Sequence, residues 1–222
     1  MLRLLLTLSL LAIPLAGEAG VEIGGSRLVY DGSAREAALS VNNPDDRPYL
    51  IQSWVDNNSG SGDGNNTFIT TPPLFRLEPH SQNSVRVVYT GRPLPSDRES
   101  MLWLNIKSVP STLKTDNNRL FITVKSQFKL FYRPEGLSGD PATAYQKLTF
   151  IRRGGHVYVS NPTPYHVSFY DLNVGEFKVK APPTVKPFSE QPLTVPADTS
   201  VLVTWRAIND FGGITDVRKL KL

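Results

Sequence analysis

Short segments in which hydrophobic and polar residues alternate run through most of the chain, and turn-forming residues separate them. A period of two is typical of strands with one buried face, and Pro, Gly, Asn and Asp between such runs mark turns. No window predicts an amphipathic helix of ordinary length. We therefore expect an all-β protein, built as a sandwich or barrel. The predicted strands are 35–41, 49–55, 84–90, 101–109, 120–132, 147–151, 156–160, 167–174, 200–208 and 215–220.

Three turn-rich stretches shape the predicted organisation. Residues 42–48, rich in Pro, Asn and Asp, are expected to close a hairpin between the first two strands. Residues 57–66 consist of Gly, Ser, Asn and Asp and predict a surface loop. Residues 133–141 contain two Pro and two Gly and divide the strands into two groups. The chain is long enough for two domains, which we place at 20–134 and 140–222.

Residues 1–19 are expected to be a secretory signal peptide rather than part of the fold. They begin with a positive charge at Arg3, continue with an apolar run at 4–15, and end in small residues up to Ala19. This order is typical of a cleaved leader. The apolar run is shorter than the roughly 20 residues that a membrane-spanning helix needs, so we predict cleavage after Ala19 and export.

Composition excludes several kinds of chemistry. The chain has no Cys, which rules out thiol catalysis, thiolate zinc sites and iron–sulfur clusters. His80, His156 and His166 lack metal-ligand spacing, and no Ser nucleophile motif lies near them. We predict no catalytic residue, metal or cofactor, and therefore no enzyme. The net charge of +4 comes from Lys and Arg scattered among acids, whereas nucleic-acid binding usually shows a clustered basic stripe.

Five residues remain as candidates for a binding role. Leu120, Ile122 and Val124 lie on one face of a predicted strand. On these residues alone, an ordinary core face is the favoured interpretation. Lys129 lies deep in the same strand, where a solvated outer face would account for it. Arg27 lies inside another apolar strand and needs either solvent or an anion.

A family resemblance rests on several motifs. In the same order along nearly the whole chain after residue 19, they resemble motifs of the periplasmic pilus chaperones, the PapD-like family. The segments are Gly20–Tyr30, Thr71–Pro79, Leu94–Ser100, Phe128–Pro134, Asn161–Tyr165 and Ile208–Gly213. The resemblance implies two immunoglobulin-like β-sandwich domains set at an angle, with a cleft between them, and a location in the bacterial periplasm.

The resemblance also gives the five candidates a role. Arg27 and Lys129 match the two cleft cations that bind the C-terminal carboxylate of a pilus subunit. Two converging charged donors suit an anion, because each charge-assisted hydrogen bond contributes about 1.5–3 kcal/mol. Leu120, Ile122 and Val124 match the strand that the family inserts into the groove of an incomplete subunit, which replaces the core-face interpretation.

The implied function is that of a chaperone that folds pilus subunits by donating a β-strand. Its implied partners are pilus subunits and the outer-membrane usher, to which it delivers them. Glu99, Arg133 and Asp210 match a trio of charges that bridges the two domains and sets the angle of the cleft. The alternative for this trio is three solvated loop charges.

The connection at 111–119 is short and lacks Cys, which resembles the short-loop branch of the family. The competing interpretation of the whole chain is a secreted β-sandwich surface subunit or adhesin. Such subunits usually carry a paired Cys and an N-terminal alternating extension, and neither is expected here. An aliphatic strand that awaits a partner also predicts capped self-association of the free protein.

Overall fold

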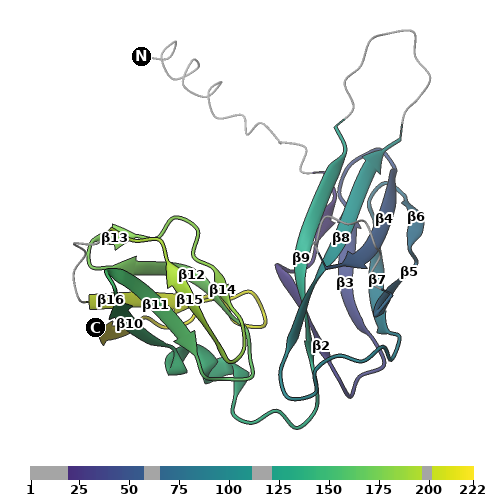
Figure 1. The fold of residues 1–222 in the computed structure, drawn as a ribbon. Helices are drawn as coiled ribbons and strands as arrows, with labels where there is room; N and C mark the ends of the chain where they lie inside the picture. The colour runs from purple at the N-terminus through teal and green to yellow at the C-terminus, as the bar shows by residue number, and fades with distance from the viewer. Residues whose placement is uncertain (1–19, 58–65, 112–121, 197–201) are drawn as a thin grey trace, which may run out of the picture.

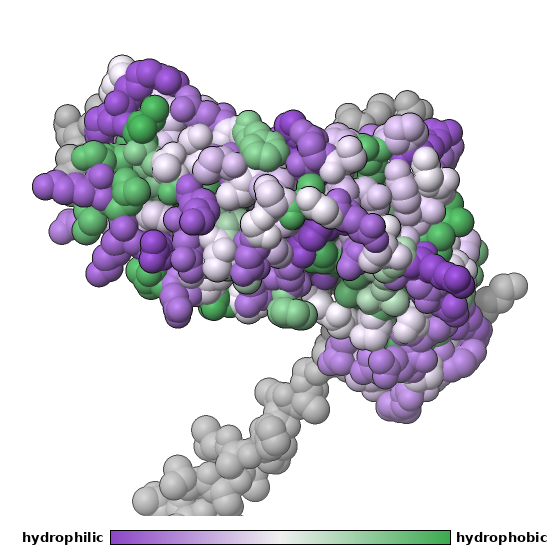
Figure 2. All heavy atoms as spheres, turned by 90° about the horizontal axis from the view of Figure 1, so that it is seen from below, coloured by the Kyte–Doolittle hydropathy of each residue, from purple (hydrophilic) through white to green (hydrophobic). Residues whose placement is uncertain are grey.

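The protein folds into two β domains joined by a short connection (Figure 1). The computed structural model describes residues 20–57, 66–111, 122–196 and 202–222. The prediction of an all-β fold is confirmed. No helix within these ranges is long and apolar enough to cross a membrane. Seen from below, the domains form two lobes on which hydrophilic residues predominate and hydrophobic residues form small groups (Figure 2).

The first domain is a sandwich of two sheets, in the orders β1-β3-β7-β5 and β2-β9-β8-β4-β6. Its strands alternate between core and surface, as on β4, where Ile51 is buried and Leu50 is exposed. The buried faces of both sheets share one hydrophobic core. The strands are β1 (Glu22–Ile23), β2 (Arg27–Asp31), β3 (Ala37–Asn43), β4 (Tyr49–Asp56), β5 (Phe68–Thr71), β6 (Leu74–Leu77), β7 (Ser81–Tyr89), β8 (Ser100–Pro110) and β9 (Val124–Arg133).

The predicted hairpin between 35–41 and 49–55 is wrong. Both strands exist, as β3 and β4, but β3 pairs with β1 and β7, whereas β4 pairs with β6 and β8. The turn between them carries the chain from one sheet to the other. Asn43 explains this path, because its buried side-chain amide donates to the carbonyls of Arg47 at 2.8 Å and Glu78 at 2.9 Å. The turn is thereby fastened to the loop before β7.

The chain changes sheets again between β1 and β2. β1 pairs with β3 in one sheet, and β2 pairs in parallel with β9 in the other. The crossing runs through Gly24 and Gly25. A Cβ on Gly24 would lie 2.0 Å from Oγ of Ser40 but 3.4 Å from its Cβ, so a larger residue here would require the Ser40 hydroxyl to turn away. After this crossing, β2 begins at Arg27.

The strand predicted at 120–132 begins later than expected. Leu120 lies outside the described residues, and Ile122 precedes the first residue of β9, Val124. The antiparallel register of β8 and β9 sets Ser108 opposite Val124. Extending that register would set Ile122 opposite Pro110, which has no N–H to donate. The hydrogen-bonded pairing of β8 and β9 therefore ends at Val124.

The second domain packs β10-β11-β15 against β13-β12-β16-β17, with β14 also paired to β12. The strand predicted at 167–174 is confirmed, while β13, β14 and β15 escaped prediction and the last strand starts at Arg218 rather than at 215. The elements are η1 (Pro141–Lys147), β10 (Thr149–Arg153), β11 (His156–Asn161), β12 (Val167–Val174), β13 (Phe177–Lys178), β14 (Thr184–Val185), β15 (Ser189–Leu193), β16 (Leu202–Ala207) and β17 (Arg218–Lys221).

Candidate functional site

Arg27 and Lys129 are neighbours on adjacent parallel strands. Arg27 of β2 is the partner of Lys129 of β9, so the two side chains leave the same face of the sheet. That face looks toward the second domain. Nη1 of Arg27 donates to the carbonyl oxygen of Ile208 at 3.0 Å. Nζ of Lys129 donates to Oγ of Ser168 at 3.4 Å and to Oγ1 of Thr184.

The two cations share a partly buried, electropositive position. Burial lowers the pKa of Lys129, and the charge of Arg27 lowers it further. Burial also lowers the pKa of Arg27, although the charges of Asp210 and Glu99 oppose that shift. No described residue accepts a hydrogen bond from the buried Nε of Arg27. Because buried donors are normally paired, this pair of cations is suited to receive an anion.

The aliphatic candidates extend past the end of the first-domain core. Val124 lies on the same side of β9 as Leu130, which is fully buried in that core. Val124 itself is 52% exposed and Ile122 is 68% exposed. Leu120, the third predicted residue, lies outside the described residues. The stripe is therefore a core-type face with no described core beneath its outer end.

One edge of β9 is open over half of its length. β8 pairs with β9 from Val124 onward, but β2 pairs with it only from Lys129 to Arg133. Over 124–128, no described strand lies along the β2 side, because the chain enters β2 only at Arg27. An unpaired edge presents free N–H and C=O groups and is a ready template for another strand.

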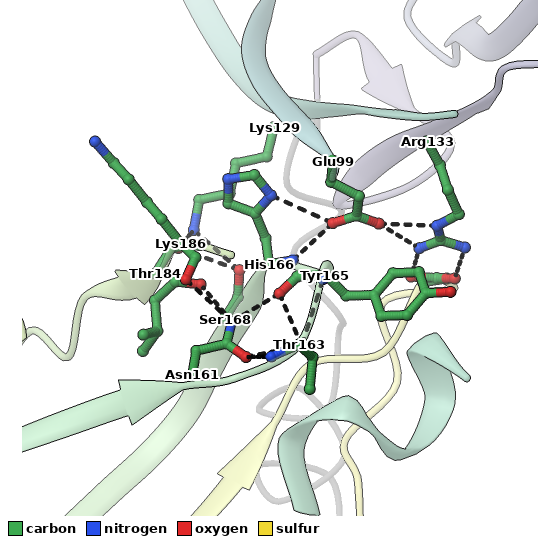
Figure 3. A network of polar contacts seen from close by, with 12 residues as sticks. Glu99, Lys129, Arg133, Asn161, Thr163, Tyr165, His166, Ser168, Thr184 and Lys186 are labelled. Atoms are coloured by element: carbon green, nitrogen blue, oxygen red, sulfur yellow. Dashed lines mark hydrogen bonds and ion pairs between the residues drawn. The ribbon is translucent and has the colours of Figure 1, made fainter. Parts of the chain in front are cut away.

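The predicted trio of charges comes together at the domain boundary (Figure 3). Nε of Arg133 donates to Glu99 at 2.8 Å, and its two terminal nitrogens donate to the Asp210 carboxylate at 2.8 and 3.1 Å. Burial favours the neutral form of Arg133, but these hydrogen bonds and charges outweigh it and raise its pKa. Asp210 belongs to the second domain, so the trio joins the two domains.

Glu99 has further partners that the sequence analysis missed. Its Oε2 accepts a hydrogen bond from the backbone N–H of His166 at 2.7 Å and lies 3.3 Å from Nδ1 of the same residue (Figure 3). The backbone N–H of Glu99 donates to the carbonyl of Pro164 at 2.9 Å. The sequence could have pointed to these partners, because Pro164 lies in the family-like segment Asn161–Tyr165 and His166 directly follows it.

Two further contacts complete the boundary. The guanidinium of Arg98 lies 5.0 Å from the ring of Phe188, and that of Arg133 lies 5.3 Å from the ring of Tyr165. Each pairs a first-domain cation with a second-domain aromatic ring. No cluster of residues suited to a metal occurs in the described part of the chain. The boundary is thus built from charge pairs, backbone hydrogen bonds and ring contacts.

Two models of one chaperone family match the chain. One is described as the pili and flagellar-assembly chaperone, PapD N-terminal domain, and covers residues 20–138. The other is the pili assembly chaperone PapD, C-terminal domain, and covers residues 143–219. The chain belongs to the PapD family of pilus-assembly chaperones. The predicted fold of two immunoglobulin-like domains is that of this chaperone family.

Relatives in the family match over most of their length. The chain is 39% identical over 214 residues to the chaperone protein FimC of Escherichia coli K12, spanning 94% of this chain and 88% of FimC. It is 38% identical over 213 residues to the chaperone protein FimB/FhaD of Bordetella pertussis, spanning 90% and 87%.

Solved structures agree with the fold. A chain of the Salmonella enterica complex of the SafA pilin with the SafB chaperone superposes with a TM-score of 0.83 at 33% identity, covering 91% of this chain and 96% of that one. The Escherichia coli chaperone DraB gives a TM-score of 0.80 at 32% identity, covering 91% and 98%.

Proposed function

We propose that this protein is a periplasmic chaperone that binds and folds pilus subunits by donating a β-strand. One observation carries the proposal: β9 has an open edge, the exposed aliphatic residues Ile122 and Val124 lie at the start of that edge, and Lys129 of β9 and Arg27 of β2 lie at its end. The names of the relatives, which are fimbrial chaperones, and the SafA–SafB complex support the same function.

The cation pair would bind the C-terminal carboxylate of the subunit. Arg27 and Lys129 leave the same face at the point where β2 meets β9. A carboxylate between them would accept charge-assisted hydrogen bonds, each contributing about 1.5–3 kcal/mol. It would also offset the charge of Arg27, which together with the larger effect of burial lowers the pKa of Lys129.

The position of the anchor fixes the direction of the incoming strand. Residues 124–128 of β9 run toward Lys129. A subunit strand that pairs with them and places its C-terminal carboxylate at Lys129 runs toward Lys129 as well. It must therefore run parallel to β9. It would occupy the line of β2, which already pairs with β9 in parallel, and its last residue would abut Arg27.

The aliphatic stripe would complete the core of the subunit. Val124 lies on the core side of β9, and continuing the same alternation toward the N-terminus would place Ile122 and Leu120 on that side as well. Full burial of each side chain would contribute about 1.5–3 kcal/mol. Because a slip of one residue would turn the stripe to the wrong face, the carboxylate anchor also sets the register.

The trio Glu99, Arg133 and Asp210 would hold the cleft at a fixed angle, because ion pairs of this kind fix geometry more than they add stability. We further propose that residues 1–19 are a cleaved leader and that the domains span 20–134 and 140–222. The short, Cys-free connection at 111–119 supports the short-loop branch. Subunits would then pass from the chaperone to the outer-membrane usher.

The role proposed is binding rather than catalysis, without cofactor or nucleic acid. In the absence of a subunit, the open edge and aliphatic stripe would favour capped self-association of the chaperone. A surface subunit or adhesin is the alternative, and the cation pair beside an open edge favours the chaperone.

Co-expression with pilus subunits from the same gene cluster tests the proposal. Subunits are recovered from periplasmic extract with wild type, Arg27→Ala or Lys129→Ala. We expect each variant to recover at least about tenfold less subunit, since truncating one partner of a buried charge pair costs several kcal/mol. Arg76→Ala and Lys180→Ala remove exposed charges elsewhere and serve as matched controls. Equal recovery by folded Arg27 and Lys129 variants would contradict the carboxylate anchor.

A further inference from the structure

A chain of side-chain hydrogen bonds crosses three strands on the outward face of the first domain. Nε2 of Gln127 on β9 donates to Oδ1 of Asn105 on β8 at 2.8 Å. Nδ2 of Asn105 donates to Oδ2 of Asp56 on β4 at 2.9 Å. The same oxygen accepts a hydrogen bond from the indole N–H of Trp54 at 3.0 Å. We refer to Asp56, Asn105 and Gln127 as the amide ladder.

The order of donors and acceptors in the amide ladder is fixed from one end. The carboxylate of Asp56 can only accept, so it orients the NH₂ group of Asn105 toward itself. The second amide hydrogen of Asn105 is used by the carbonyl of Trp103 at 3.2 Å. The side-chain oxygen of Asn105 is thereby left to face β9. It is a fixed acceptor for the Gln127 donor.

Asn105 is 0% exposed although it lies on the outward face of its sheet. Its neighbours on that face explain this burial. Trp54 lies opposite Asn105 on β4, and Trp103 lies two residues before it on β8. Nζ of Lys125 lies 5.2 Å from the Trp54 ring, which adds a second contact between β9 and β4. Gln127 and Lys125, which make these two contacts, both lie in the half of β9 whose other edge is open.

The two halves of β9 are held differently. From Lys129 to Arg133 the strand has partners on both edges, and Leu130 packs in the core. From Val124 to Phe128 it pairs with β8 alone; Phe128 packs against the core, but Val124 is 52% exposed. Such a segment opens locally at low cost, because few buried contacts resist it. The amide ladder therefore holds this half of β9 where core packing is sparse.

We infer that Asp56, Asn105 and Gln127 are positioning residues that hold the open half of β9 straight and in register on β8. This inference rests on the proposed function, since it is the strand presented to the subunit that the amide ladder would preorganise. Preorganisation lowers the ordering cost of binding. The ladder lies on the face of β9 opposite the aliphatic stripe, so it holds the strand without occupying the face whose side chains would enter the subunit.

Hydrogen exchange in the free chaperone tests the hold directly. Gln127→Met keeps the length of the side chain and its neutrality but removes the donor. We expect the amides of 124–128 that point at β8 to exchange about fivefold faster, the effect of one net hydrogen bond on local opening. Gln127→Lys restores a donor and should restore the slow exchange. Gln52→Met, the same change on the outward face of β4, is the matched control.

Subunit capture by the same variants tests the positioning role. With the co-expressed pilus subunit as probe, Gln127→Met should slow capture about fivefold, whereas the urea midpoint of the chaperone should fall only by the amount that one net hydrogen bond accounts for, and Gln127→Lys should rescue both. Unchanged exchange in Gln127→Met would overturn the inference, as would faster exchange with unchanged capture. Failure of wild type to capture any subunit would instead overturn the proposed function, and the positioning role with it.

Discussion

Asn43 in the first domain and Asn161 in the second occupy equivalent corners, each at the end of a strand and followed by Pro. Asn43 is 0% exposed and Asn161 is 1% exposed. In the first corner, the side-chain amide donates to the carbonyls of Arg47 at 2.8 Å and Glu78 at 2.9 Å. A turn and a distant loop are fastened by one side chain.

The second corner repeats this arrangement. The amide of Asn161 donates to the carbonyls of Tyr165 at 2.7 Å and Lys186 at 3.1 Å (Figure 3). The loops that the two corners hold are also alike. Each has a residue in the left-handed region two positions further on, His80 with φ of 51° and Phe188 with φ of 49°.

The corners differ in what surrounds them. His80 contacts Asp46 of its own domain, at an exposed position. Phe188 instead contacts Arg98 of the first domain, and the turn at Pro164 and His166 binds Glu99. The same local structure serves the fold in one domain and the domain boundary in the other. The buried Asn gives both corners the same local structure, and the residues around each corner decide whether it contacts the other domain.

The largest effect is expected from releasing the second corner from the first domain. Arg133→Met leaves the carboxylate of Glu99 buried without its cation. We expect the free energy of unfolding to fall by about 3 kcal/mol, measured by urea denaturation. Arg153→Met removes an exposed ion pair with Glu190 and should cost less than about 1 kcal/mol. A similar cost for both variants would refute the structural weight given to Arg133.

Removing the two Asn side chains tests whether the corners are equivalent. Asn43→Leu and Asn161→Leu each leave buried carbonyls without their donor, so each should lower the free energy of unfolding by about 2 kcal/mol. Urea denaturation measures both. Only Asn161→Leu should also reduce subunit capture, because its turn holds Glu99. Equal loss of capture in both variants would show that the corners do not divide their roles in this way.

A smaller effect is expected at the two residues with positive φ. In His80→Gly, relief of strain offsets the added entropy of the unfolded chain, so stability should change by less than about 0.5 kcal/mol. Phe188→Gly should lower stability by about 1 kcal/mol, because it also loses the ring contact with Arg98. Thermal unfolding compares them. Identical melting shifts would mean that the Phe188 ring contributes nothing to the boundary.

The smallest effect concerns pH. Folding lowers the pKa of Lys129 from 10.5, mainly by burial and then by the charge of Arg27. The unfolded chain thus binds this proton more tightly, and the free energy of unfolding rises as pH increases through the folded pKa toward 10.5. Lys129→Met should remove this rise from urea midpoints measured between neutral pH and pH 10.5. A rise of the same size in the variant would rule out Lys129 as its source.

Alternation alone predicted most strands but not their partners. It placed β12 correctly, yet it joined β3 to β4 as a hairpin. The error has a physical cause, since a Pro- and Asx-rich turn looks the same whether it closes a hairpin or changes sheets. The repeated Asn-Pro of Asn43 and Asn161 was the signal that could have distinguished them.

The candidate site depended on resemblance more than on pattern. Nothing local to Arg27 or Lys129 shows that they are partners, because their adjacency comes from the parallel pairing of distant strands. The amide ladder was invisible for the same reason. Gln127 and Asn105 look like ordinary outward residues until the register of β8 and β9 sets them opposite each other.

The late start of β2 at Arg27 has a practical consequence. Under the proposed function, a subunit strand lying along β9 meets the first residue of β2 end to end. The cleft therefore has room for a subunit chain only if that chain ends at Arg27. A purification tag fused to the C-terminus of a subunit would collide with Ser26 and Arg27. Tags for reconstitution therefore belong on the C-terminus of the chaperone, which lies in the second domain (Figure 1).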